Sequence, residues 1–291
     1  MAQSDPPLGP PPAKKPRRVS PPEPELKAEL QSRTCCSAET VVSFSTDSVA
    51  NTTVPDDECS VQVLEIKKEE DEIPDLLFVE LQKENVEDVV SALKRMRELF
   101  LSSNTNAVKN WKAAAPLGPI SLVVLAMRKW PDHQDIQNYS CRSLANMLSV
   151  SWKHGLGKFA MVKSGGIEAV VRSLKTFSES LELQFVGCCT LMNAFKLHPN
   201  DPRSVAEGMI RFVENLDGID IIVGMMKRFP DHVGLLSACC TLLIGLTVIK
   251  NNHGTMIKNG AVEAVACVQK NHCDNESLKK RTIKFLMDVF A

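Results

Sequence analysis

The sequence predicts an all-α fold, namely a superhelical solenoid of about four to five helical repeats that follows a disordered N-terminal tail. Three observations predict it. A segment of similar sequence recurs at intervals of 42 to 52 residues, apolar residues within each copy recur at the spacing of one helix face, and the first 74 residues lack the composition of a packed core. Because such repeats stack on their neighbours, they bury a common core that no single copy could form.

The N-terminal tail, residues 1–74, is rich in Pro, Ser, Thr and Glu and poor in aromatic residues. Such a segment cannot bury enough apolar surface to offset the entropy that its chain would lose on folding. We therefore divide the chain into a disordered tail, residues 1–74, and a helical repeat domain, residues 75–291. Up to Asp75 there are 8 Lys and Arg against 15 Asp and Glu, a net charge of −7, and the remaining 26 basic and 20 acidic residues give the rest of the chain +6.

Short motifs in the tail suggest targeting and modification. The stretch PPAKKPRRVSPPEPE (11–25) contains a proline-flanked basic cluster that resembles a nuclear-import signal, although a solvated charge run accounts for it equally well. A Ser-Pro dipeptide follows, where a phosphate would partly neutralise the cluster. Two lysines lie in apolar-Lys-x-Glu sequences, the attachment pattern of the small ubiquitin-like modifier, with chance occurrence as the competing explanation. The basic cluster is Lys14, Lys15, Arg17 and Arg18, and the candidate modification sites are Ser20, Lys27 and Lys67.

Four to five copies of the repeat can be aligned. Three central copies match closely, and an aromatic residue, Trp130, Phe177 or Phe229, holds the same place in each of them. A weaker copy follows, and a candidate fifth copy that lacks the glycine precedes them. The central copies are residues 118–148, 165–195 and 217–246, the weaker copy is 259–290, and the fifth candidate is 86–100.

Each copy begins with a helix that should be buried along one face. In the second central copy Ile167, Val170, Val171 and Leu174 recur at helical spacing and form one apolar stripe. The helix should end at the aromatic residue, because the proline that follows it in two copies cannot extend a helix. The predicted N-caps of the next helix are Asp132, Asp231 and, in the middle copy, Ser178 and Glu179.

A long second helix follows in each copy and is rich in small residues, which let neighbouring helices approach closely. A shorter helix then leads to the glycine that opens the next copy, most clearly in GKFAMVKSGGIEAVV (157–171) and NNHGTMIKNGAVEAV (251–265). We predict that Gly166 and Gly260 have a positive φ, which turns the chain sharply into the following helix.

This order of three helices resembles the armadillo repeat family. The resemblance rests on the pattern x-I/V-x-x-G-G/A-I/V-x-x-V-V, followed by a Cys-x-x-Leu-x-Asn helix, and it covers about residues 85–291. It implies a right-handed solenoid whose third helices line a concave groove, where an extended or helical segment of another protein binds. Solenoids of this kind serve recognition, so the expected function is that of a protein-interaction scaffold or adaptor.

The third-helix positions of the family give a candidate groove. Nuclear-import adaptors of the importin-alpha type carry Trp and Asn four residues apart there; Asn146 and Asn193 fit the Asn position, but Arg142 and Cys189 replace Trp, which argues against a nuclear-signal receptor. The two asparagines either bond the backbone of a bound peptide or satisfy a local backbone group, and the sequence leaves both open. The hypothesised partner-binding groove comprises Tyr139, Arg142, Asn146, Cys189, Asn193 and Cys240.

Histidines and cysteines recur in the repeat. His133 and His232 follow the same Pro-Asp pair in two copies, whereas a metal ligand or catalytic base is usually unique, so we interpret both as residues of a first helical turn and predict no metal site. The cysteines are duplicated as well, and we predict packing for them, with a redox or thiol-modification role as the alternative. These thiol pairs are Cys188-Cys189 and Cys239-Cys240.

No motif in the sequence predicts an enzyme or a cofactor, because a nucleophile motif, a phosphate-binding glycine loop and a carboxylate pair are all missing. The N-terminus lacks the apolar core of a secretory signal, so we expect the cytoplasm or nucleus. The expected partners are other proteins, with no small-molecule substrate and no membrane, and dispersed lysines with few aromatic residues argue against nucleic acid. The alternatives are a nucleic-acid-associated regulator and a structural subunit of a larger nuclear assembly.

Overall fold

The structure, a computed structural model, describes residues 75–151, 156–198 and 203–291. Helices and connecting turns make up these residues, and no strand occurs among them. In chain order the helices are α2 (Asp75–Glu80), α3 (Val86–Leu99), α4 (Ala107–Ala114), η1 (Ala115–Leu117), α5 (Pro119–Lys129), α6 (Gln134–Ser151), α7 (Leu156–Lys163), α8 (Gly166–Thr176), α9 (Leu181–Phe195), α10 (Arg203–Asn215), α11 (Gly218–Arg228), α12 (Val233–Leu246), α13 (Asn251–Lys258), α14 (Ala261–Asn271) and α15 (Glu276–Val289).

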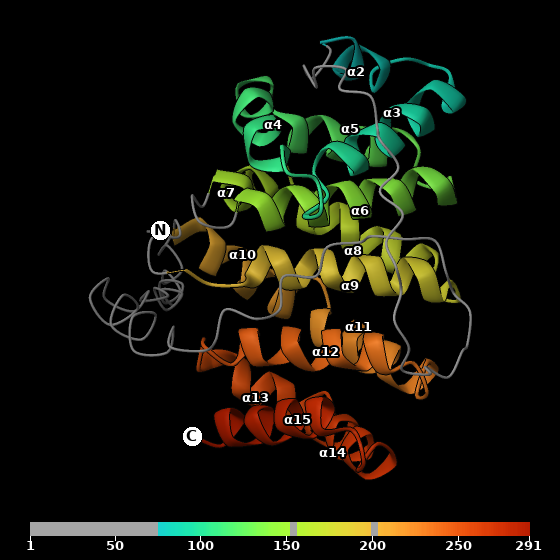
Figure 1. Ribbon diagram of the computed structural model, residues 1–291. Helices are drawn as coiled ribbons and strands as arrows, with labels where there is room; N and C mark the ends of the chain where they lie inside the picture. The colour runs from blue at the N-terminus through green and yellow to red at the C-terminus, as the bar shows by residue number, and fades with distance from the viewer. Residues whose placement is uncertain (1–74, 152–155, 199–202) are drawn as a thin grey trace, which may run out of the picture.

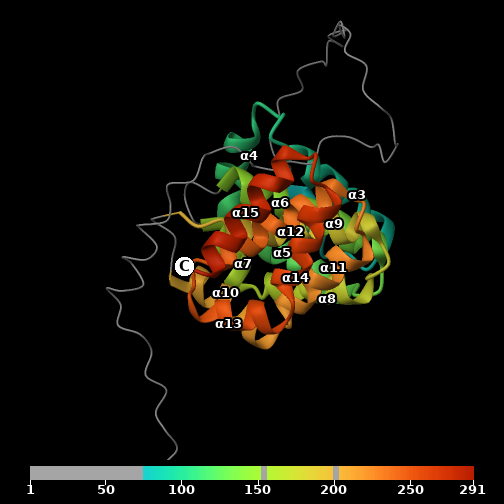
Figure 2. The ribbon, with the colours of Figure 1, turned by 90° about the horizontal axis from the view of Figure 1, so that it is seen from below.

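The helices form a solenoid of three-helix repeats (Figure 1). The third helices α3, α6, α9, α12 and α15 pack on one another in this order, and the second helices α5, α8, α11 and α14 form a parallel row. Figure 2, a view along the stack, shows the third helices overlapping and the first helices α7, α10 and α13 at another edge. This arrangement confirms the predicted all-α solenoid. The four complete repeats are α4–α6, α7–α9, α10–α12 and α13–α15, and α2–α3 is an incomplete repeat before them.

The candidate fifth copy, residues 86–100, has a different role from the one that the alignment gives it. The alignment compares it with the helices that follow the glycines, but α3 packs on α6 as a third helix. Its N-cap, Asn85, accepts a hydrogen bond from the backbone N–H of Glu87 at 2.8 Å, as expected of a helix that starts at a polar cap. Second and third helices share the same apolar spacing, so the sequence pattern alone does not show that residues 86–100 form a third helix.

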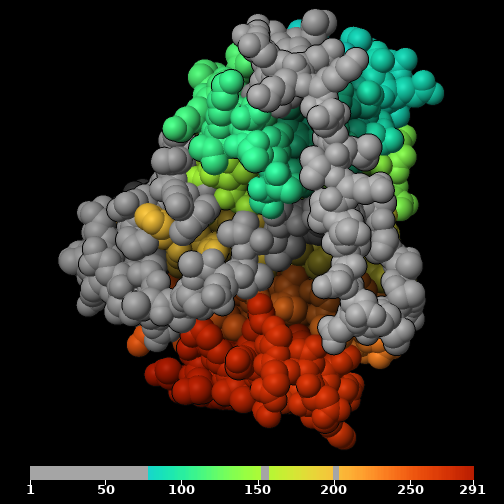
Figure 3. Space-filling model, in the orientation of Figure 1, coloured from blue at the N-terminus to red at the C-terminus, as the bar shows by residue number. Residues whose placement is uncertain are grey.

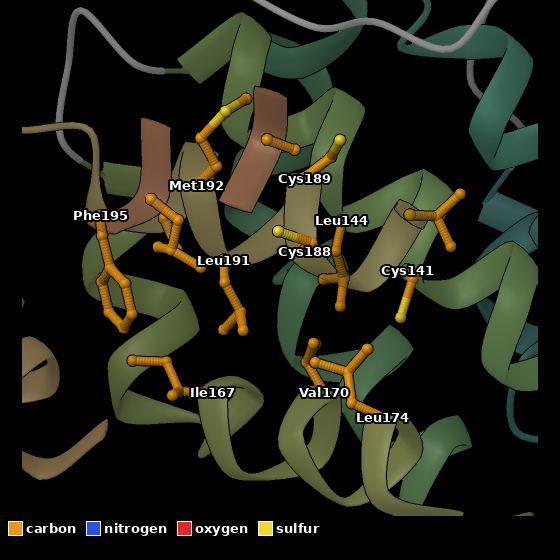
Figure 4. Close-up of a cluster of buried hydrophobic side chains, with 14 of the residues drawn as sticks. Cys141, Leu144, Ile167, Val170, Leu174, Cys188, Cys189, Leu191, Met192 and Phe195 are labelled. Atoms are coloured by element: carbon orange, nitrogen blue, oxygen red, sulfur yellow. The ribbon is translucent and has the colours of Figure 1, made fainter. Parts of the chain in front are cut away.

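Each second helix buries the apolar stripe that the sequence predicts. Ile167, Val170 and Leu174 of α8 are at most 2% exposed, and in Figure 4 they point toward Leu191 of α9 and its neighbours. Gly187 brings the two helices together, because a Cβ at this position would lie 2.6 Å from Leu174 Cδ2. The small residues of the third helices therefore serve close packing, as predicted.

A residue in the left-handed region opens every second helix. Gly260 has a positive φ as predicted, but ahead of α8 the left-handed residue is Gly165 and the prediction of Gly166 is wrong. Gly166 has a different use, because a Cβ there would lie 2.4 Å from Met161 Sδ, so the glycine gives α7 and α8 the space to meet. The four left-handed residues are Gly118 (φ 67°), Gly165 (φ 70°), Asp217 (φ 57°) and Gly260 (φ 77°).

Four residues separate each second helix from the third helix that follows it, α6, α9, α12 or α15. The first of the four is the C-cap, and its carbonyl accepts a backbone hydrogen bond from the fourth, as from His232 to Phe229 at 3.2 Å. The N-cap of the third helix is therefore the fourth residue of the turn, and the predicted caps Asp132, Asp231, Ser178 and Glu179 are wrong. The observed caps are His133, Ser180, His232 and Asn275, whose side chains each accept a hydrogen bond from a backbone N–H three residues later.

A buried glutamine, which was not among the predicted features, connects the second helix to the third in two repeats. Gln137 Nε2 donates to the carbonyl oxygens of Met127 at 2.9 Å and Trp130 at 2.8 Å. Gln184 Nε2 does the same with Leu174 and Phe177 at 2.8 and 3.1 Å. Met127 and Leu174 lie in the last turn of α5 and α8, where carbonyls have no partner within the helix, and Trp130 and Phe177 are the C-caps. One amide therefore bonds both the end of the second helix and the turn that follows it.

We predict that His232→Ala destabilises the protein by about 1 kcal/mol, because the Nδ1 acceptor at 2.9 Å from the Leu235 N–H is lost from the start of α12. Urea unfolding followed by circular dichroism at neutral pH measures the change. His232→Asn is the matched control, since an asparagine oxygen can accept the same bond and should retain most of the stability. Equal losses in both variants would contradict a capping role.

Candidate partner-binding face

Four of the six residues predicted to line the groove are buried. Asn146, Cys189 and Cys240 are fully buried, and Asn193 is 4% exposed. Tyr139 and Arg142 are half-buried and reach the surface of α6. Among the six predicted residues, only these two can contact a partner without a rearrangement, so the predicted groove set requires correction.

The asparagines are buried because they bond the preceding repeat. Asn146 Nδ2 donates to the carbonyl oxygen of Arg97 in α3 at 3.1 Å, and Asn193 Nδ2 donates to that of Ala145 in α6 at 3.0 Å. In both cases the acceptor lies in the third helix one repeat earlier. The sequence left open whether these asparagines bond a bound peptide or a backbone group of the chain itself. The structure shows the second of these roles.

Two hydroxyl groups repeat the pattern one helical turn before the asparagines. Ser143 Oγ donates to the Leu93 carbonyl at 3.0 Å, and Thr190 Oγ1 lies between two carbonyl oxygens, 2.9 Å from that of Cys141 in α6 and 2.8 Å from that of Val186 in its own helix. Together with Asn146 and Asn193 they form a ladder, which we call the polar ladder, between α3, α6 and α9. The ladder was not predicted, although the sequence does place a polar residue three positions before each asparagine.

The residues that do reach the surface form contacts between successive third helices. Lys94 Nζ of α3 lies 5.0 Å from the ring centre of Tyr139 in α6. Arg142 Nη2 of α6 donates to Glu182 Oε1 of α9 at 2.6 Å, while Arg142 Nε donates to Asn138 Oδ1 at 3.1 Å. One side-chain contact thus links each helix to the next.

The same pattern continues to the end of the stack. The Phe185 ring of α9 lies 5.4 Å from the ring of His232, the N-cap of α12, and Arg281 Nε of α15 donates to Thr241 Oγ1 of α12 at 3.0 Å. All of these residues are exposed or half-buried. We call this set the rim: Lys94, Tyr139, Arg142, Glu182, Phe185, His232, Thr241 and Arg281.

Glu182 is held in its charged form at the centre of the rim. Partial burial alone would raise the pKa of this carboxyl, but hydrogen bonds from Asn138 and Arg142 and the positive charge of Arg142 outweigh burial, so the pKa is lowered. The pair is specific in geometry, yet Glu182 keeps 48% of its side chain exposed. Its contribution to stability is therefore that of a screened surface pair.

A comparison with known families agrees with this architecture. The sequence profile of the LRRK2 ARM repeat family matches residues 76–289, about three quarters of the chain. The chain belongs to this family. The match confirms the predicted resemblance to armadillo repeats and covers all five third helices. No curated protein matches the chain significantly.

The duplicated cysteines of this ARM repeat domain lie in its core. Cys188 Sγ and Cys239 Sγ are 3.8 Å apart between α9 and α12. Burial raises the pKa of Cys141 and of Cys240 to about 12, and a hydrogen bond with Cys188 together with burial raises that of Cys239. Because the thiolate is the reactive form of cysteine, these environments disfavour redox chemistry and favour packing.

Other predicted sites of the ARM repeat protein are placed as follows. The basic cluster Lys14, Lys15, Arg17 and Arg18 and the candidate modification sites Ser20, Lys27 and Lys67 lie outside the described residues. Within residues 75–151, 156–198 and 203–291, three or more His, Cys, Asp or Glu side chains nowhere gather in a way that suits a metal ion. None of the helices described is both long and apolar enough to span a bilayer.

We predict that Asn193→Ala lowers the free energy of unfolding by about 1–3 kcal/mol, because it removes a buried hydrogen bond between repeats and leaves a small void. Thermal and urea unfolding measure the loss. Asn259→Ala is the control, because it removes an exposed side-chain bond to Asp220 and should change stability by less than about 0.5 kcal/mol. If the two variants were equally stable, the polar ladder would not hold the repeats together.

We predict that Glu182→Gln destabilises the protein at pH 7 by at most about 1 kcal/mol, and that the difference from wild type shrinks once the pH falls below the unfolded-state pKa of about 4.3. The folded-state pKa is lowered, so the charged pair stabilises above the unfolded-state pKa and its contribution is lost as the pH falls through the folded value. Urea unfolding at pH 7 and pH 3.5 tests this. Glu179→Gln, at an ion pair with Arg228 in which Glu179 is 81% exposed, is the control and should matter less at pH 7. A loss that persisted undiminished at pH 3.5 would refute the assignment.

Proposed function

We propose that this chain is a protein-interaction scaffold that binds an extended or helical segment of another protein across its third helices, with the rim as the contact surface. The observation that carries the proposal is that surface side chains link every third helix to the next, from α3 to α15. A segment laid across the stack would therefore meet side chains of five successive helices. The family supports an interaction solenoid, since stacked repeats offer long surfaces.

The chemistry of the rim favours an acidic partner segment that carries apolar or aromatic side chains. The rim contains three basic residues, Lys94, Arg142 and Arg281, and one acidic residue, Glu182. Its half-buried aromatic rings, Tyr139 and Phe185, offer flat apolar contact area of the kind enriched at binding hot spots. The positive charge would raise the association rate, and the rings would supply affinity.

The proposal includes that the chain acts by binding and not by catalysis. The rim has no nucleophile paired with a base, and its one carboxylate is bonded to an arginine. We also propose the cytoplasm or nucleus as the site of action, with the basic cluster of the tail serving import. These inferences rest on the sequence of the tail and on the character of the rim.

We expect that replacing Tyr139 and Phe185 by alanine releases the partners of the chain. Affinity purification followed by mass spectrometry should compare wild type, the Tyr139→Ala/Phe185→Ala double variant and the control Leu125→Ala, which alters an exposed residue of α5, in the second-helix row. A partner that the control retains and the double variant loses is then titrated as a purified protein, with an expected loss of affinity of at least tenfold.

Circular dichroism and thermal unfolding establish that both variants are folded before binding is compared. A second arm uses Arg142→Ala, for which weaker binding should be accompanied by a smaller dependence on salt. Recovery of the same partners, with the same affinities, by all variants would overturn the proposed rim, and recovery of none by wild type would overturn the scaffold function.

A further inference from the structure

The C-terminal end of the solenoid exposes an apolar stripe. Ile283, Met287 and Phe290 are 40%, 69% and 67% exposed, and their spacing of four and three residues places them on one face of α15 and its C-cap. The opposite face of α15 is buried in the core through Leu278, Thr282, Phe285 and Val289. The helix α15, at the C-terminal end of the row of third helices, therefore has two apolar faces. The described residues cover one of them and leave the other exposed.

This stripe differs from the single exposed apolar residues elsewhere. In α6, α9 and α12 most apolar residues are buried, because a third helix packs against each flank. Figure 2 views the stack from the α15 end, and Figure 3 shows the C-terminal repeat as the lower end of the molecule. The stripe thus occupies the position at which a further third helix would pack.

We propose that this face binds a second copy of the same chain, with α15 of one copy antiparallel to α15 of the other. Antiparallel helices juxtapose opposite dipole ends, and a twofold axis makes the same surface serve both copies. The inference is independent of the proposed function, because the stripe shares no residue with the rim.

The sequence of α15 is self-complementary about a twofold axis near position 286. By helical spacing, such an axis places Ile283 of each copy near Phe290 of the other and brings the two Met287 side chains together. Lys284 and Asp288, which form an ion pair at 3.1 Å within one helix, flank the stripe on one side. The same axis sets each Lys284 beside the Asp288 of the second copy, so apolar and charged groups match in one arrangement. This match favours a second copy over an unrelated partner.

The experiment is sedimentation velocity of the full chain at roughly 1–200 µM under reducing conditions, which exclude a disulfide through the exposed Cys267 and Cys273. We expect a monomer–dimer equilibrium, because a face of this size gives weak association. Met287→Glu should weaken the dimer at least tenfold by placing two carboxylates in the apolar centre. Leu125→Glu, which adds the same charge at a 52% exposed leucine of α5, should leave the association unchanged.

A charge swap separates contact between copies from effects within one helix. Each of the variants Lys284→Asp and Asp288→Lys should be monomeric alone. In a dimer of either variant, positions 284 and 288 of the two copies would carry charges of the same sign and repel each other. An equimolar mixture of the two variants should associate, because acidic flanks then face basic flanks. A wild-type chain that stayed monomeric up to 200 µM, equal effects of Met287→Glu and Leu125→Glu, or a mixture no more associated than its components would each overturn the proposal.

Discussion

The rest of the structure depends on hydrogen bonds from one third helix to the main chain of the one before it. Ser143 and Asn146 of α6 and Asn193 of α9 donate to carbonyl groups that already belong to a helix. A buried polar group without a partner is costly, so these side chains fix how far and at what rotation neighbouring helices pack. The rim follows from that register, because Arg142 meets Glu182 only when α6 and α9 are aligned in this way.

The polar ladder stops at α12, and a difference of one residue explains why. Thr190 lies ten residues after its cap Ser180, whereas Thr241, its counterpart in the sequence alignment, lies nine residues after its cap His232. One residue corresponds to about 100° of rotation, so Thr241 no longer points at α9. Its hydroxyl lies 2.8 Å from the Ser237 carbonyl oxygen of its own helix. In the described chain, no α12 side chain donates to the α9 backbone, and apolar packing with the Cys188 and Cys239 thiols fills the interface.

The sequence predicted what depends on local pattern. Apolar spacing located the helices, the aromatic residues marked where second helices end, and the small residues indicated close packing, as at Gly187. Features set by contacts between repeats were missed. Both Asp132 and His133 could cap a helix, and the cap is His133 because its backbone N–H closes the turn on the Trp130 carbonyl. Likewise, position 166 is a glycine because Met161 packs against it, which the local sequence does not show. Asn146 looked available to a partner, because nothing in its own segment shows that the carbonyl of Arg97 lies within reach.

The interface between α9 and α12 differs in kind from those that join α3, α6 and α9. A hydrogen bond weakens steeply when its donor and acceptor move out of line, whereas the hydrophobic effect depends on buried area and has no preferred direction. The stack therefore has two kinds of interface: side chains bond the neighbouring main chain from α3 to α9, and apolar contact joins α9 to α12. A ligand that bound on both sides of Phe185 would lie across the place where the two kinds meet.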